Sequence, residues 1–256
     1  MTWVVAAAGL NFGVMVGDSR ISDGAGNPID GVELVKFWGL QPETFVGFAG
    51  SITLAIDLVG ILEGYTEALR LTPIEKFLNF FVKRAPVQRA RGYGRNACEL
   101  VILDMPNQRP VDPSPFRLFR TYRLALAASG KWDLDLLDGA GMGFSHIGSG
   151  ATSPADLSRE LRTVVSDFNS ISCSDDLSAQ TAALRAAQAV RKGIERYDRE
   201  DVGGSSYYAV MSPWSVSAAP HRLGESSARV LNVRNFNQWL KERSELRTHE
   251  AMSFTA

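Results

Sequence analysis

Thr2 could supply both a nucleophile and a base if it became the N-terminal residue of the chain. A threonine hydroxyl is a poor nucleophile until a neighbouring group takes its proton, and a free N-terminal amine can be that group. Threonine is small enough for routine removal of the initiator Met1, which would leave the α-amine on Thr2. Such an amine titrates at about 7.7–8.0, so a useful fraction accepts a proton near neutral pH. We therefore hypothesise that Thr2 is a catalytic nucleophile.

Three further residues offer the groups that such a site needs. Asp18 follows the second predicted strand, Lys36 interrupts the third, and Gly50 lies where the fourth meets a helix. Asp18 would supply an acid that positions a cation, Lys36 the cation that lowers the pKa of the amine, and Gly50 a backbone N–H for an oxyanion. Taken singly, each is more often structural: a strand-end aspartate, an edge lysine or a helix-entry glycine. Their order along the chain favours chemistry.

Three short segments around these positions resemble a known enzyme family. They are Gly17-Asp18-Ser19-Arg20, Val35-Lys36-Phe37 and Phe48-Ala49-Gly50. With Thr2 they resemble proteasome β-type subunits and the bacterial HslV peptidase, which are N-terminal nucleophile (Ntn) hydrolases. The separation from Thr2 to Asp18 matches the family's, whereas Lys36 and Gly50 each fall two positions late. One two-residue insertion between Asp23 and Gly31 explains both offsets.

Two later segments extend the resemblance. Ile147-Gly148-Ser149-Gly150 is similar to the family's Gly-Ser-Gly, and Asp201-Val202-Gly203-Gly204 is similar to the segment that holds its supporting aspartate. The chain departs from the family in the longer separation between Ser149 and Asp201. It also has glycine where the family usually has a serine shortly after that aspartate. The resemblance implies that Ser149 and Asp201 orient the amine of Thr2.

The resemblance also implies a set of substrate-binding residues. The single-insertion alignment assigns seven residues to substrate binding, mainly in the pocket for the substrate residue before the scissile bond. They are Ile21, Ser22, Leu34, Trp38, Phe48, Ile52 and Ile56. None of these side chains is charged. We therefore expect either a preference for apolar substrate side chains or a pocket nearly closed by Phe48 and Trp38. The alternative is that these residues only form part of the hydrophobic core.

The hydrophobic pattern predicts the elements that position these residues. Apolar, partly β-branched runs predict strands, and recurrence at helical spacing predicts helices. The predicted strands are Trp3–Ala8, Phe12–Gly17, Val32–Leu40, Thr44–Ala49, Cys98–Asp104, Phe116–Tyr122, Leu124–Ala128, Gly143–Gly148, Ser205–Ser212 and Val230–Val233. The predicted helices run from Ile52 to about Leu71, from Thr72 through Phe81, and over Ser153–Asn169, Asp175–Arg196 and Phe236–Arg247. This order, together with the resemblance, predicts an α+β fold: a four-layer αββα sandwich in a single domain, residues 1–256.

Composition excludes several classes of protein. The net charge of −1 gives no support for a nucleic-acid or membrane-surface partner. Cys98 and Cys173 are isolated, and with three scattered histidines they do not form a zinc site. We expect no metal, no cofactor, no membrane span and no secretory signal, and hence a cytoplasmic protein with buried free thiols.

The resemblance implies a threonine-type endopeptidase that acts on peptides or unfolded proteins. It implies a homo-oligomeric ring around the site, with a ring ATPase as a candidate partner. Two alternatives remain open. One is an amidase or acyltransferase that acts on a small molecule, because a fold does not determine a substrate. The other is a non-catalytic structural ring subunit, which retention of Met1 would favour.

Overall fold

The structure is a computed structural model of the 256-residue chain. It describes residues 2–9, 11–23, 27–41, 44–64, 74–84, 96–105, 119–127, 132–136, 143–148, 163, 175–196, 204–214, 216, 220–224 and 226–253.

One five-stranded antiparallel sheet contains the N-terminal hairpin. Its strands are β1 (Trp3–Gly9), β2 (Phe12–Asp18), β9 (Gly143–Gly148), β10 (Ser206–Met211) and β11 (His221–Leu223), in the order β11-β10-β2-β1-β9. The hairpin is present as predicted, with Val4 opposite Gly17 and Gly9 opposite Phe12. Both faces of β1 and β2 are buried, which explains why their sequences are apolar throughout instead of alternating.

A second five-stranded antiparallel sheet contains β4 (Phe37–Gln41), β5 (Thr44–Gly50), β6 (Asn96–Asp104), β7 (Arg120–Ala127) and β8 (Trp132–Leu136), in chain order. Side chains from the facing sides of the two sheets form one apolar cluster, to which Val4, Ala6 and Met15 contribute from the first sheet and Phe45 and Val101 from the second. Alternate residues of β1, β6 and β10 thus point into the space between the sheets.

A third, small sheet joins distant parts of the chain. β3 (Val32–Leu34) pairs in parallel with β12 (Arg229–Leu231). The residues between β3 and β4, Val35 and Lys36, cross from this sheet to the second one. Lys36 lies at that crossing point.

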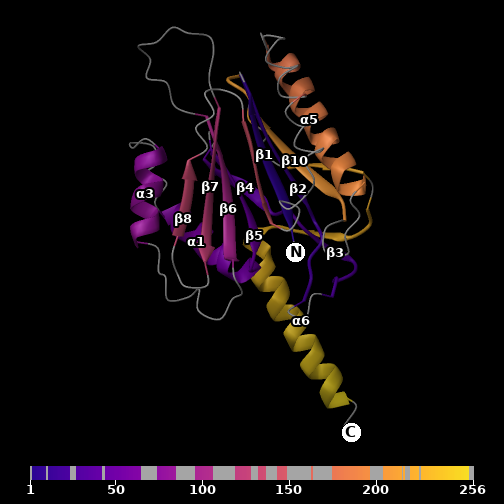
Figure 1. Cartoon of the computed structure of the whole chain (residues 1–256). Coiled ribbons are helices and arrows are strands. Elements are labelled where there is room, and N and C mark those ends of the chain that lie inside the picture. Colours follow the sequence, from indigo (N-terminus) through magenta and orange to yellow (C-terminus); the bar gives the residue numbers. More distant parts are fainter. Residues whose placement is uncertain are drawn as a thin grey trace.

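The helices cover the outer faces of the large sheets (Figure 1). An alanine-rich face of α5 (Asp176–Arg196) packs on β1, β2 and β10, and its small side chains allow close approach to the strands. α1 (Ile52–Gly64) and α3 (Ile74–Arg84) pack on the second sheet. The first turns of α6 (Val233–Ser253) bury Phe236 and Trp239 in the same cluster, and the rest of α6 extends beyond the strands (Figure 1). None of the described helices is long and apolar enough to cross a membrane.

The predicted four-layer αββα sandwich is wrong. The described residues form twelve strands in three sheets against four helices, so the fold is mostly β and is not built of two sheets alone. The third sheet belongs to neither large sheet, and α6 projects away from them instead of completing a layer (Figure 1). The predicted helix at Ser153–Asn169 lies outside the described residues, apart from Thr163, which is helical.

Three predictions of strands need correction. The strand predicted over Val32–Leu40 is two strands, because the chain changes sheets at Lys36. The two strands predicted on either side of Arg123 are the single strand β7, because Glu99 of the neighbouring strand pairs with this arginine and lets the strand continue through a charged residue. β8 and β11 were not predicted, although Trp132–Leu136 alternates apolar and acidic residues.

Candidate functional site

The Asp18 carboxylate connects the N-terminal strand to Lys36. One oxygen accepts a hydrogen bond from the backbone N–H of Trp3 at 2.7 Å. The other lies 2.8 Å from Nζ of Lys36, and the side chains of Lys36 and Asp18 are 1% and 0% exposed. The contact between Lys36 and Asp18 that the resemblance implied is therefore present, directly beside Thr2.

The crossing between β3 and β4 determines where Lys36 lies. The N–H of Leu34 donates to the carbonyl of Ser19, and the N–H of Val35 donates to the carbonyl of Leu231, both at 2.9 Å. The carbonyl of Lys36 accepts from the N–H of Phe48, also at 2.9 Å. Three different segments thus hold the backbone on both sides of Lys36, which limits the positions open to its ammonium group.

Burial makes this ion pair costly. Removing two charges from water costs several kcal/mol per ion, and a buried pair is often no more stabilising than apolar side chains of similar volume. Stability alone therefore gives a weak reason for a buried lysine and aspartate at the end of β2. A requirement for a fixed positive charge beside Thr2 gives a stronger reason.

Gly148 brings Thr2 and the end of β5 together. Thr2 is itself buried, with 5% of its surface exposed. A Cβ built on Gly148 would lie 1.9 Å from the carbonyl oxygen of Thr2 and 3.1 Å from Cβ of Ala49. Thr2 and Ala49 therefore lie against the same residue, and the next residue along is Gly50. Only glycine can occupy position 148, because its φ of +89° is also in the left-handed region.

Gly50 ends β5 and leads the chain into α1. Its φ is +94°, and it is solvent-exposed, unlike the six buried residues before it in the strand. This conformation turns the backbone from the strand into the helix. A backbone N–H at a turn of this kind is the type of donor that stabilises an oxyanion.

Ser149 and Asp201 lie outside the described residues, so their assigned roles stay predictions. Their described neighbours nevertheless lie close to the other site residues. Gly148, directly before Ser149, contacts Thr2. Gly204 lies three residues after Asp201, and a Cβ on it would be 2.6 Å from Oγ of Ser19, the residue after Asp18.

The structure brings the predicted substrate-binding residues together, but as part of the core. Ile21, Leu34 and Phe48 are at most 2% exposed, and Trp38, Ile52 and Ile56 are half-buried against the same cluster. The ring centroids of Trp38 and Phe48 are 5.9 Å apart. The role of these residues in a substrate pocket stays a prediction.

Two polar atoms within this set have no hydrogen-bond partner in the part of the chain that the structure describes. They are Oγ of Ser22 and Nε1 of Trp38, and both are buried. A buried donor without a partner costs about 1–3 kcal/mol. Both atoms could donate to oxygen atoms of a ligand.

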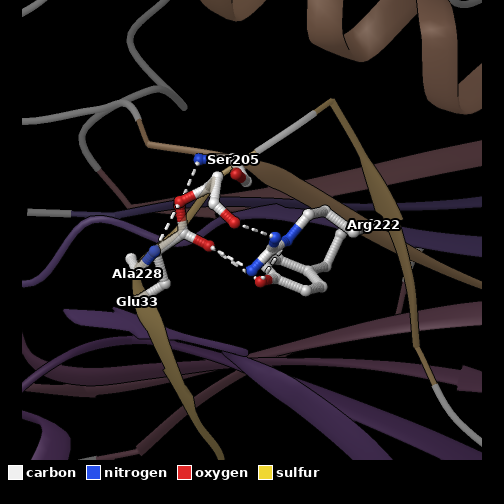
Figure 2. Close-up of polar contacts among 6 residues, drawn as sticks. Glu33, Ser205, Arg222 and Ala228 are labelled. Atoms are coloured by element: carbon white, nitrogen blue, oxygen red, sulfur yellow. Dashed lines mark hydrogen bonds and ion pairs between the residues drawn. The ribbon is translucent and has the colours of Figure 1, made fainter. Parts of the chain in front are cut away.

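Glu33 is a buried carboxylate that the sequence did not single out. Its carboxylate accepts hydrogen bonds from the N–H of Ser205 at 3.1 Å and the hydroxyl of Tyr207 at 2.8 Å. Arg222 completes the cluster at 3.3 Å from Glu33 and 2.9 Å from the Tyr207 hydroxyl. Figure 2 shows the carboxylate directed at Ser205 and Arg222. The cluster attaches β3, and with it the segment leading to Lys36, to β10 and β11.

These contacts determine the charges of Glu33 and Tyr207 at neutral pH. Burial acts to raise the pKa of the Glu33 carboxyl, but hydrogen bonds from Tyr207, Ser205 and Ser226 outweigh it, so the pKa is lowered. Burial and the hydrogen bond to Glu33 raise the pKa of Tyr207 to about 12. At neutral pH Glu33 is therefore charged and Tyr207 is a neutral donor.

A cavity of about 440 Å³ lies between α5 and the strands β10 and β11, and its lining shares no residue with the predicted site. Within the described ranges, no three His, Cys, Asp or Glu side chains are grouped as metal ligands.

No protein-family model matches the chain, and no curated protein is significantly similar to it. The assignment of a function therefore depends on the geometry around Thr2 and on the resemblance of the segments that form it.

Proposed function

We propose that the protein is an N-terminal threonine hydrolase of the proteasome β and HslV type, which cleaves peptide bonds after removal of Met1. The observation that carries this proposal is the buried contact of Asp18 with both Trp3 N–H and Lys36, at 2.7 and 2.8 Å. It holds a positive charge and the first peptide of the chain in fixed positions. Thr2 then has the hydroxyl, the amine and the nearby cation that this chemistry requires.

The reaction begins with attack of the Thr2 hydroxyl oxygen on the carbonyl carbon of the substrate. The Thr2 amine takes the hydroxyl proton, and the charge of Lys36 keeps the pKa of that amine low enough for it to act as a base. The N–H of Gly50 donates to the tetrahedral oxyanion, a contact worth about 10²–10³ in rate.

Collapse of the intermediate breaks the C–N bond, and the leaving amine takes the proton held by the Thr2 ammonium. The product is an ester between the Thr2 hydroxyl and the acyl part of the substrate. Water, deprotonated by the same amine, then hydrolyses the ester and regenerates the hydroxyl. Ser149 and Asp201 would orient the amine in both halves of the reaction.

The resemblance supports a homo-oligomeric ring that encloses the site, with peptides or unfolded proteins as substrates and a ring ATPase as a candidate partner. Enclosure would prevent an exposed peptidase from attacking other proteins. Sedimentation of the purified protein tests this, since a monomer under assay conditions would contradict the ring.

A second candidate is an amidase or acyltransferase that uses the same Thr2 chemistry on a small molecule. The core burial of Ile21, Leu34 and Phe48 favours it, because a closed apolar set leaves little room for a peptide side chain. The buried donors of Ser22 and Trp38 would suit a compact substrate that carries oxygen atoms.

The test compares wild type with Thr2→Ala on two substrate sets: fluorogenic peptides with apolar, acidic or basic residues before the cleaved bond, and small amides. Thr2-dependent turnover of apolar peptides supports the peptidase, whereas turnover of the amides alone supports the second candidate. Activity that persists in Thr2→Ala contradicts both. Intact-mass measurement addresses the third alternative, because a retained Met1 would favour a structural subunit.

A further inference from the structure

A second ion pair, with a buried carboxylate and a partly exposed arginine, lies close to the proposed nucleophile, and neither residue was among the predicted site residues. Glu99, on β6, is 6% exposed and lies opposite Ala49 in the second sheet. One of its oxygens accepts a hydrogen bond from Arg123 on β7. The other accepts the backbone N–H of Gly148 at 2.8 Å.

The contact between Glu99 and Gly148 joins the two large sheets at one edge. β9 is the last strand of the first sheet in the described order, so one side of its backbone has no neighbouring strand. A free N–H on such an edge needs a partner when it is shielded from water. Glu99 supplies that partner from the opposite sheet, and Arg123 fixes the direction of its carboxylate.

Gly148 transmits this contact to Thr2. It lies opposite Trp3 in the pairing of β1 with β9, and no side chain fits between it and the carbonyl of Thr2. Any shift of Gly148 would therefore move the backbone against which Thr2 packs. It would equally move the next residue, Ser149.

We propose that Glu99 is a positioning residue for the nucleophile: through Gly148 it holds Thr2 at the reacting carbonyl. This inference depends on the proposed function of Thr2. Its physical basis is that a displacement of about 1 Å in a reacting group can cost 10²-fold in rate. Glu99 touches neither the substrate nor the reacting atoms. We therefore expect its substitution to change kcat and to leave KM nearly unchanged.

Two variants separate the reach of Glu99 from its charge. Glu99→Asp keeps the carboxylate but shortens the side chain by one methylene, so it loses the N–H of Gly148. Glu99→Gln keeps the length and one oxygen for this N–H, while Arg123, whose side chain is 33% exposed, turns to water instead. Asp104→Asn is the matched control, since Asp104 is another buried carboxylate of β6, bonded to Thr44 at 2.7 Å. It lies five residues, or about 17 Å, along the strand from Glu99.

The measurement is kcat and KM on an apolar fluorogenic peptide, with kcat normalised to the sites titrated by a threonine-directed covalent inhibitor. This normalisation removes the effect of partly unfolded protein. We expect Glu99→Asp to lower kcat per site by about 10- to 100-fold with KM nearly unchanged. Glu99→Gln and Asp104→Asn should stay close to wild type. Equal kcat in Glu99→Asp and Asp104→Asn, equal loss in both Glu99 variants, or a change confined to KM would overturn the inference.

Amide hydrogen exchange separates this inference from the proposed function. If wild type shows no Thr2-dependent turnover, the proposed function fails, yet the contact can still be tested. The amide of Gly148 should exchange faster in Glu99→Asp than in wild type and Glu99→Gln. Equal exchange in all three proteins would show that Glu99 does not hold Gly148, and the inference would fail independently.

Discussion

Lys36→Met and Asp18→Asn test the buried pair beside Thr2 from its two sides. Lys36→Met keeps most of the side-chain volume but leaves the Asp18 carboxylate without its cation, in a place where neither side chain is more than 1% exposed. Breaking a buried pair from one side costs about 3–5 kcal/mol. In a chain of this size each kcal/mol lowers Tm by about 2–4 °C, so we expect a decrease of about 6–20 °C. Asp18→Asn should cost a similar amount.

The double variant separates stability from chemistry. Together, Asp18→Asn and Lys36→Met replace the pair with neutral groups, a change that is often close to neutral for stability. We therefore expect the double variant to lose several kcal/mol less than the sum of the two single losses. Peptidase turnover should remain lost, because the positive charge beside the amine of Thr2 is gone.

Urea unfolding and peptide turnover, measured on the same preparations, check both expectations. Single variants that lose less than about 1 kcal/mol would mean that the pair is solvated, against the exposure found here. A double variant that regains turnover along with stability would show that the pair is only structural. Either result would contradict a buried ion pair that serves the chemistry of Thr2.

Three further predictions concern residues around the site. Gly148→Ala should destabilise the protein by at least about 1–3 kcal/mol from the strain of a positive φ and abolish labelling of Thr2, because its Cβ would lie 1.9 Å from the Thr2 carbonyl oxygen; unchanged stability would contradict this. The lowered pKa of Glu33 stabilises the fold above pH 4.5, its ordinary value, and this contribution is lost as the pH falls through the lower folded value. Urea unfolding at several pH values should therefore show a smaller acid-induced decline in Glu33→Gln than in wild type, and parallel curves would argue against it. Burial raises the pKa of the Cys98 thiol, so iodoacetamide should modify Cys98 only after unfolding; peptide-resolved mass spectrometry on folded protein checks this, and adducts there would show the site to be open.

Local sequence patterns were sufficient for the hairpin and for the residues around Lys36 and Asp18. The apolar runs at the N-terminus predicted β1 and β2, because continuous burial on both faces leaves a continuous apolar signal. The order of the acidic, basic and glycine residues predicted the contact between Asp18 and Lys36, which is present at 2.8 Å. The catalytic roles of these residues stay predictions.

Long-range contacts explain most of what the sequence could not predict. β3 pairs with β12, and Glu33 meets Ser205 and Arg222, 172 and 189 positions away. No local periodicity encodes such partners, so the third sheet and the Glu33 cluster were missed and the four-layer sandwich was wrongly predicted. The same limit applies to Glu99, whose contact with Gly148 links two sheets.

Mass spectrometry of a covalent adduct tests directly whether Thr2 is the nucleophile. The native protein is treated with a threonine-directed inhibitor, digested, and the modified residue is located. We expect loss of Met1 and a single adduct on Thr2, absent from Thr2→Ala and slowed in Lys36→Met. A retained Met1, or an adduct on another residue, would contradict it.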